Sequence, residues 1–164
     1  MKKTMKRMAS LTLGLCMAFT IVTPVNAAVK GNQSSKKING YVLTTRMALE
    51  EEYTIYVADP ANVGHAKKKA IKEAKWATQA EYKGPKDNGK LTTTWMFSSP
   101  DGSVKWEAEG NSGTGKITGG SKTRKADVVT VKGTLCGTSL KNVTMTSKAS
   151  FKKGNIEYFV SCKK

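Results

Sequence analysis

Polar and apolar residues alternate most regularly in three segments, 76–82, 91–97 and 104–108. Glycine, proline, aspartate and asparagine are concentrated between these segments. This alternation predicts half-buried β-strands joined by tight loops. All three tryptophans of the chain fall on the predicted inner side. We expect the inward positions to share one face that anchors the core: Trp76, Thr78, Ala80, Tyr82, Leu91, Thr93, Trp95, Phe97, Val104, Trp106 and Ala108.

Further strand-like segments flank this region. They are rich in β-branched and aromatic residues, which favour strands. Together with the first three segments they predict about seven to nine short strands. The fold class predicted is therefore mainly β, as a small antiparallel β-sandwich or a partly closed barrel. The additional segments are 41–47, 53–57, 128–136, 143–145, 149–151 and 156–162.

One segment has helix-forming composition. Asp59 and Pro60 suit the cap and the first position of a helix, and alanine, lysine and glutamate follow. This pattern predicts one short helix at 61–72 that passes into a strand. A single helix that continues to Tyr82 is the alternative interpretation.

The N-terminal residues 1–27 have the organisation of a secretory signal peptide. A basic start is followed by a short apolar run and by a small residue, Ala27, at the expected cleavage site. Cleavage after Ala28 and an uncleaved membrane anchor are the alternatives. No later segment is apolar enough to span a membrane. Residues 28–38 predict a flexible basic leader, and 39–164 a single β-rich domain.

The predicted mature chain keeps two cysteines, Cys136 and Cys162. In an exported protein they most simply form one intramolecular disulfide bond, which would tie the last strand to the one ending near Cys136. A pair of free thiols or an intermolecular bond is the alternative. Two thiols and the single histidine, His65, make a poor zinc site, so no metal or cofactor is expected.

The chain is strongly basic, with a formal net charge of +16. Removal of the four basic residues of the signal peptide leaves 24 Lys and Arg against 12 Asp and Glu. Most of the excess lies after residue 110. Such asymmetry suggests an anionic partner. The alternative is that lysines keep a β-protein soluble and protect its sheet edges.

A glycine-rich basic segment, 110–125, is predicted to form a long loop. It contains G-x-x-x-x-G-K, but Ile117 stands where a nucleotide-binding P-loop needs Ser or Thr. Successive glycine N–H groups could instead cradle a phosphate or sulfate. The anion-binding residues of such a nest would be Lys116, Lys122, Arg124 and Lys125. A mobile, soluble loop is the favoured interpretation of this segment, and the anion-binding nest is the alternative.

No catalytic residues are predicted. His65 is not accompanied by a nucleophile motif, and Glu107 and Glu109 occupy the side opposite the tryptophans, as solvent-facing residues do. An exposed aromatic platform is a second possibility for the tryptophans, although a core role is favoured. If one of them is exposed, we expect it to be Trp76, which lies nearest the lysine-rich segment.

These patterns favour a secreted, non-enzymatic, cationic protein that acts at an anionic surface, either cell-wall polymer or membrane lipid headgroups. An antimicrobial, bacteriocin-like role fits this general character, although no motif aligns with a family. Nucleic acid is a less favoured partner. An extracellular protein-binding module or inhibitor is the alternative function, and a small secreted hydrolase is the second alternative.

Overall fold

The computed structural model describes residues 29–38, 40–58, 68–85 and 89–164. These residues form eleven β-strands and no helix, so the described part contains no helix able to cross a bilayer. The strands are β1 (Val29–Ile38), β2 (Tyr41–Glu50), β3 (Tyr53–Ala58), β4 (Lys68–Lys83), β5 (Lys90–Ser98), β6 (Val104–Ala108), β7 (Asn111–Gly115), β8 (Ile117–Arg124), β9 (Val128–Gly137), β10 (Thr144–Lys153) and β11 (Ile156–Lys163).

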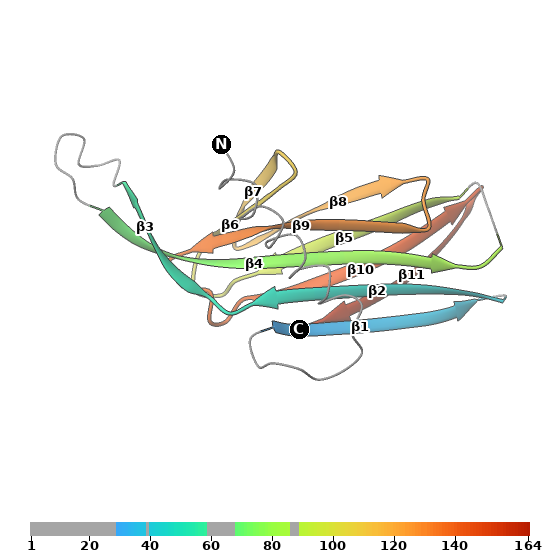
Figure 1. The fold of residues 1–164 in the computed structure, drawn as a ribbon, viewed down its shortest axis with the longest axis horizontal. Helices are drawn as coiled ribbons and strands as arrows, with labels where there is room; N and C mark the ends of the chain where they lie inside the picture. Colours follow the sequence, from blue (N-terminus) through green and yellow to red (C-terminus); the bar gives the residue numbers. More distant parts are fainter. Residues whose placement is uncertain (1–28, 39, 59–67, 86–88) are drawn as a thin grey trace, which may run out of the picture.

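The strands build two antiparallel sheets that face each other (Figure 1). Sheet A has seven strands in the order β1-β2-β4-β9-β6-β7, and β3 also pairs with β4. Sheet B has four strands in the order β11-β10-β5-β8. Neither order closes on itself. The predicted antiparallel sandwich is therefore confirmed, and its alternative, a partly closed barrel, is not observed.

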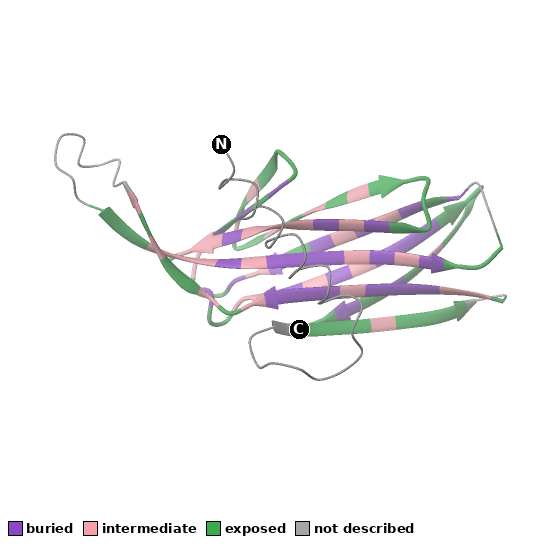
Figure 2. Ribbon diagram, in the orientation of Figure 1, coloured by how far each residue is buried: buried purple, intermediate pink, exposed green. Residues whose placement is uncertain are grey.

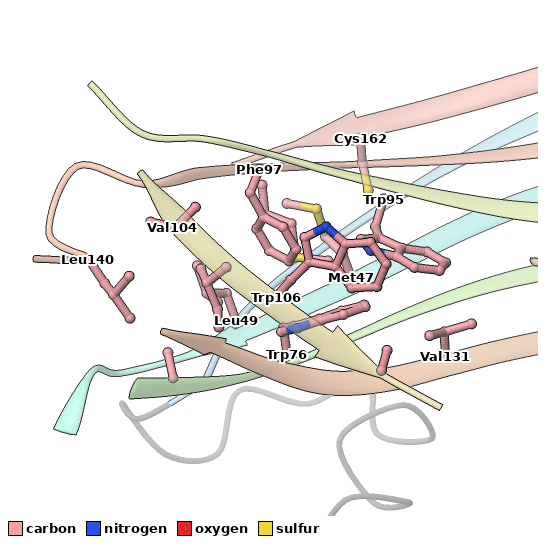
Figure 3. Close-up of a cluster of buried hydrophobic side chains, with 14 residues drawn as sticks. Met47, Leu49, Trp76, Trp95, Phe97, Val104, Trp106, Val131, Leu140 and Cys162 are labelled. Atoms are coloured by element: carbon pink, nitrogen blue, oxygen red, sulfur yellow. The ribbon is translucent and has the colours of Figure 1, made fainter. Parts of the chain in front are cut away.

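All eleven predicted inward positions are buried. They do not share the face of a single sheet, however, because β4 and β6 belong to sheet A and β5 to sheet B. The chain crosses from one layer to the other after β4 and again after β5. The tryptophans consequently meet across the interior: Trp95 of sheet B lies 5.3 Å from both Trp76 and Trp106 of sheet A, between ring centroids (Figure 3).

The core consists of two apolar clusters with a polar layer between them. The tryptophan cluster includes Met47, Trp76 and Phe97, and the second cluster includes Leu43 and Tyr82. On each of four strands, a buried hydroxyl residue separates a member of one cluster from a member of the other: Thr45 on β2, Thr78 on β4, Thr93 on β5 and Ser147 on β10. Each of the four is 0% exposed.

Two glycines in strands make room for the tryptophan rings. A Cβ atom on Gly133 would lie 2.1 Å from the carbonyl oxygen of Glu107 and 2.7 Å from the ring of Trp76. A Cβ atom on Gly120 would lie 2.7 Å from the ring of Trp95. All three distances are far below van der Waals contact, so only glycine fits at these positions.

The helix predicted at 61–72 is wrong for the residues of this segment that the structure describes. Residues 68–72 belong to strand β4, and residues 61–67 lie outside the described residues. The alternative, a helix continuing to Tyr82, is wrong as well. Pairing with β3 and β9 overrides the local helix preference of alanine and lysine, because each sheet partner satisfies backbone groups and buries Ala74 and Ala77.

The expected flexible leader is also corrected. Residues 29–38 form β1, which pairs with β2 along its whole length. The strand is polar because it is an edge strand whose described side chains are mostly exposed. The predicted signal peptide, 1–27, lies outside the described residues.

The glycine-rich segment 110–125 is not a long loop. It forms β7 at the edge of sheet A and β8 at the edge of sheet B, with Lys116 between them. Close approach to the tryptophans, as at Gly120, explains why glycines occur in these strands.

Candidate functional site

The four predicted anion-binding residues do not form one site. Lys122 forms an ion pair with Glu109, at 2.5 Å between Nζ and Oε1. Lys116 precedes β8, whereas Arg124 ends it and Lys125 follows. Because a strand rises about 3.3 Å per residue, Lys116 and Arg124 lie roughly 25 Å apart. The predicted nest is therefore not observed. Of its four residues, only Arg124 and Lys125 belong to a second group of basic residues, described next.

Basic residues converge at one end of the sandwich, on the right in Figure 1. In sheet B, Lys90 pairs directly with Lys152, and Arg124 pairs with Leu91 next to Lys90. In sheet A, Lys37 and Lys83 both pair with Val42. We call this group the basic end; its members are Lys36, Lys37, Lys83, Lys90, Arg124, Lys125, Lys152 and Lys153.

Aromatic contacts hold the two sheets together beneath the basic end. The rings of Tyr82 in β4 and Phe151 in β10 are stacked, with centroids 4.1 Å apart. Tyr41 of β2 contacts Tyr158 of β11 edge to face, at 5.6 Å. These contacts hold together the strand ends that carry the lysines of sheet A and those of sheet B, so both groups lie at the same end of the sandwich.

Most basic side chains of the basic end have no ion-pair partner among the described residues. Lys83 forms an ion pair with Glu81, at 3.2 Å. The other nearby acids among the described residues are Asp127 and Glu157. Within the described part of the chain, five exposed members have neither an ion-pair partner nor a cation–π contact: Lys37, Lys90, Arg124, Lys125 and Lys152. This end of the sandwich therefore carries an excess of positive charge among the described residues.

Two exposed apolar side chains lie beside the basic end. Val128 begins β9 and is 46% exposed, and Ile156 begins β11 and is 57% exposed. Ile156 pairs directly with Lys153. The basic end thus combines positive charge with exposed apolar groups, as surfaces that contact lipid headgroups do.

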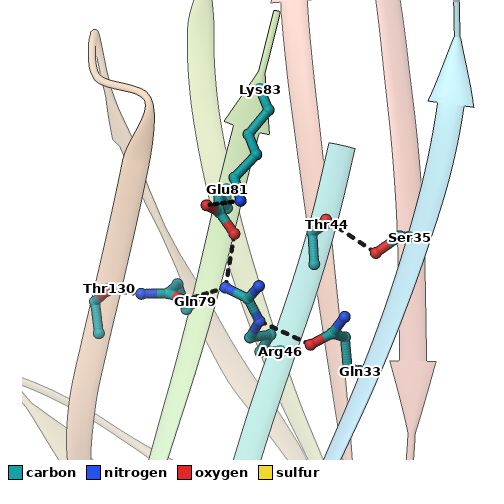
Figure 4. A network of polar contacts seen from close by, with 8 residues as sticks. All are labelled: Gln33, Ser35, Thr44, Arg46, Gln79, Glu81, Lys83 and Thr130. Carbon is teal, nitrogen blue, oxygen red and sulfur yellow. Dashed lines mark hydrogen bonds and ion pairs between the residues drawn. The ribbon is translucent and has the colours of Figure 1, made fainter. Parts of the chain in front are cut away.

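A polar network centred on Arg46 supports the strands that lead to the basic end (Figure 4). Arg46 of β2 donates to Gln33 of β1 and to Gln79 and Glu81 of β4. Burial alone would raise the pKa of the Glu81 carboxyl, but hydrogen bonds and charges from Lys83 and Arg46 outweigh it and lower the pKa below its ordinary value. Glu81 therefore stays ionised and ties β4 to β2 through Arg46, which in turn contacts β1.

The favoured core role of the tryptophans is confirmed, and the alternative, an exposed platform with Trp76 as its most exposed member, is not observed. The Trp76 side chain is only 2% exposed, and its Nε1 donates to the backbone oxygen of Thr134. Among the described residues, the exposed aromatic side chains are Tyr53, Tyr56 and Phe159. The Phe159 ring lies under Lys148, whose Nζ is 4.6 Å from the ring centroid.

The predicted disulfide bond is also wrong, since both cysteines are free. Cys136 lies on the outer face of sheet A, where its thiol donates to Glu73 at 3.6 Å. Cys162 lies inside, in the tryptophan cluster, and its thiol donates to the backbone oxygen of Asn32. The side chains project on different faces of different sheets, so no bond can form between them without rearrangement.

The Cys136 thiol is not an activated nucleophile. Burial, together with the charge and hydrogen bond of Glu73, raises its pKa to about 11. Among the described residues, no three His, Cys, Asp or Glu side chains are grouped as metal ligands require. Glu107 and Glu109 form ion pairs with Lys105 and Lys122. His65 lies outside the described residues.

Comparison with known proteins gives only remote structural similarities. No family model matches the chain, and no curated protein matches it. The GAE domain of GGA2p from Saccharomyces cerevisiae has a TM-score of 0.30 and 7% identity, covering 80% of this chain and 94% of that one. The yeast GGA1 GAE domain has a TM-score of 0.29 and 10% identity, covering 79% and 93%. A protein from Archaeoglobus fulgidus has a TM-score of 0.28 and 12% identity, covering 71% and 92%. Scores this low assign neither family nor function.

Proposed function

We propose that this protein is a secreted, non-enzymatic, cationic protein that attaches to an anionic surface through its basic end. The observation that carries the proposal is the convergence of eight basic residues from both sheets at one end, five of them exposed and with neither an ion pair nor a cation–π contact among the described residues. Sequence charge alone indicated an anionic partner, and the strand register supports the proposal because it brings these residues to one end of the sandwich.

The expected strength follows from the number of unpaired charges. A lysine or arginine close to an anionic membrane contributes about 1 kcal/mol. Five such residues together give about 5 kcal/mol, which corresponds to a dissociation constant on the order of 0.1 mM. Such weak attraction suits an extended surface with many charges better than a single small anion.

Exposed apolar groups favour a membrane over a purely polymeric surface. Burial of a Val or Ile side chain stabilises a contact by roughly 1.5–3 kcal/mol when complete. Val128 and Ile156 stand at the border of the basic end and are available for such burial. A cell-wall polymer, which offers charge and hydroxyl groups, would gain little from these side chains.

Binding of the purified protein to cell walls, to anionic vesicles and to DNA, measured over a salt series, tests the proposal. We expect binding to anionic vesicles or walls that falls steeply with added salt and is absent from zwitterionic vesicles. Replacement of Ile156 with Ser should weaken vesicle binding and leave wall binding unchanged. Binding that is insensitive to salt would contradict the proposal, and so would failure to bind any anionic surface.

A further inference from the structure

Strand β3 and the first residues of β4 form a two-stranded ribbon that projects beyond the sandwich, on the left in Figure 1. β3 pairs with residues 68–73 of β4, whereas β9 pairs with β4 only from Lys72 onward. Residues 68–71 therefore have β3 as their one neighbouring strand among the described strands. Most of the ribbon is exposed in Figure 2, and Tyr56 is 69% exposed.

The outer edge of β3 has no neighbouring strand in the described part of the chain. β1 pairs with β2 alone, and this pairing ends at Val29 opposite Glu50. The six residues of β3, Tyr-Thr-Ile-Tyr-Val-Ala, contain no charge, proline or glycine. An open edge of this composition is a template for another strand. A two-stranded ribbon alone is marginally stable in water, and addition of strands stabilises it.

The charges on the ribbon indicate which strand fits. Glu50, Glu51 and Glu52 lie at its base, before β3, whereas Lys68 and Lys69 lie at its tip, where Lys68 pairs with Ala58. Two identical ribbons joined antiparallel about a two-fold axis place the acidic base of each beside the basic tip of the other. A parallel arrangement would bring like charges together.

The distances permit this contact. Neighbouring strands lie about 4.8 Å apart. With Glu51 of one copy opposite Val57 of the other, Lys69, which pairs with Val57, would lie two strand spacings, roughly 10 Å, across the sheet from Glu51. Extended lysine and glutamate side chains span such a gap. Both residues are exposed and are not engaged in an ion pair among the described residues.

We propose that β3 pairs antiparallel with β3 of a second copy of this chain, so that the two ribbons form one four-stranded sheet. The contact is small, so the dimer is weak and depends on concentration. The residues involved lie at the opposite end from the basic end, and the inference does not depend on the proposed function.

Sedimentation equilibrium over a wide concentration range tests the dimer with the protein as it is produced and processed by its host. The variants are Glu51→Lys, Lys69→Glu, the double variant E51K/K69E, and Lys116→Glu as a control with the same charge change away from the ribbon. We expect the wild type to dimerise. Each single variant should weaken dimerisation about fivefold, because two equivalent contacts become repulsive. The double variant should restore it, and the control should not change it.

Hydrogen exchange provides a second measurement. The β3 amides should exchange quickly in dilute solution and more slowly as the concentration rises. Three results would overturn the proposal: a wild type that is monomeric throughout, a dimer that is indifferent to both single variants, or β3 amides protected even at the lowest concentration. The last result would show that another part of the chain already covers this edge.

Discussion

The hydroxyl groups of Thr45 and Ser147 lie 2.7 Å apart, and this hydrogen bond joins β2 of sheet A to β10 of sheet B inside the core. Ser147 also contacts the hydroxyl of Thr78, which in turn lies 3.0 Å from that of Thr93. Four strands, two from each sheet, thus share one buried polar chain. Because hydroxyl groups buried without a partner are costly, this chain fixes how the two layers align.

Replacement of Ser147 with Ala tests this role. The variant removes the hydroxyl that both Thr45 and Thr78 contact, and we expect the free energy of unfolding to fall by about 1–3 kcal/mol. Chemical denaturation measures the change. The control is Ser35→Ala, which removes an exposed hydroxyl bonded to Thr44, and its effect should stay within about 0.5 kcal/mol. Equal losses in the two variants would argue against a special role for the buried chain.

Replacement of Gly133 with Ala tests the packing around the tryptophans. The added methyl group would overlap the carbonyl oxygen of Glu107 and the ring of Trp76, so we expect a loss of about 1–3 kcal/mol and a changed tryptophan fluorescence. Gly31→Ala is the matched control in a strand, because its Cβ atom would meet nothing nearer than 3.4 Å. A stable Gly133→Ala protein with unchanged fluorescence would contradict the close contact.

The Tyr53 hydroxyl donates to the Glu73 carboxylate, and this bond, followed by burial and the carboxylate charge, raises the pKa of Tyr53 to about 12. Since the folded pKa lies above the ordinary value of 10.0, the stabilisation is present below pH 10 and is lost as the pH rises through about 12. Ultraviolet titration, with Tyr53→Phe to identify the signal, should show this ionisation. Glu73→Gln should move the ionisation of Tyr53 to lower pH; an unchanged value would remove Glu73 as its cause.

The two thiols should differ in reactivity. Cys136 is partly exposed with a pKa raised to about 11, so its alkylation should be slow at neutral pH and accelerate as the pH increases. Cys162 is buried and should react only after unfolding. Mass spectrometry of the alkylated protein distinguishes the sites. A mass that increases by two hydrogens on reduction would show a disulfide bond and contradict the free thiols of this structure.

The sequence predicted the fold class because alternation persists wherever a strand packs against the opposite sheet. Trp95 and Phe97 of β5, for example, alternate with partly or largely exposed Thr94 and Met96. The sequence-based prediction failed where a strand is stabilised by pairing with its neighbours and shows no alternation of apolar and polar residues. β1 has almost no apolar residues, and its pairing with β2 is supported by contacts such as Gln33 with Arg46.

The sequence predicted a basic site, but it did not predict which basic residues lie together. Net charge indicated an anionic partner, but lysines distant in sequence meet through strand register, as Lys90 and Lys152 do, and local spacing cannot show this. An anion-binding nest was predicted at 116–125 because the basic residues of this segment are close in sequence. As an extended strand, it separates Lys116 from Arg124 and pairs Lys122 with Glu109. Charged residues that are close in sequence are thus separated along an extended strand. Charged residues that are distant in sequence lie together where the strands of a sheet end.

Binding to anionic vesicles by a double variant of the basic end tests the central claim most directly. Lys90→Gln with Lys152→Gln removes two charges that the register places side by side, whereas Lys116→Gln with Lys141→Gln removes two exposed charges elsewhere. Loss of about 2 kcal/mol should weaken binding roughly 30-fold in the first variant at low salt, and the second variant should bind nearly as the wild type does. Equal weakening in both variants would mean that net charge alone drives attachment, and would contradict a binding surface at the basic end.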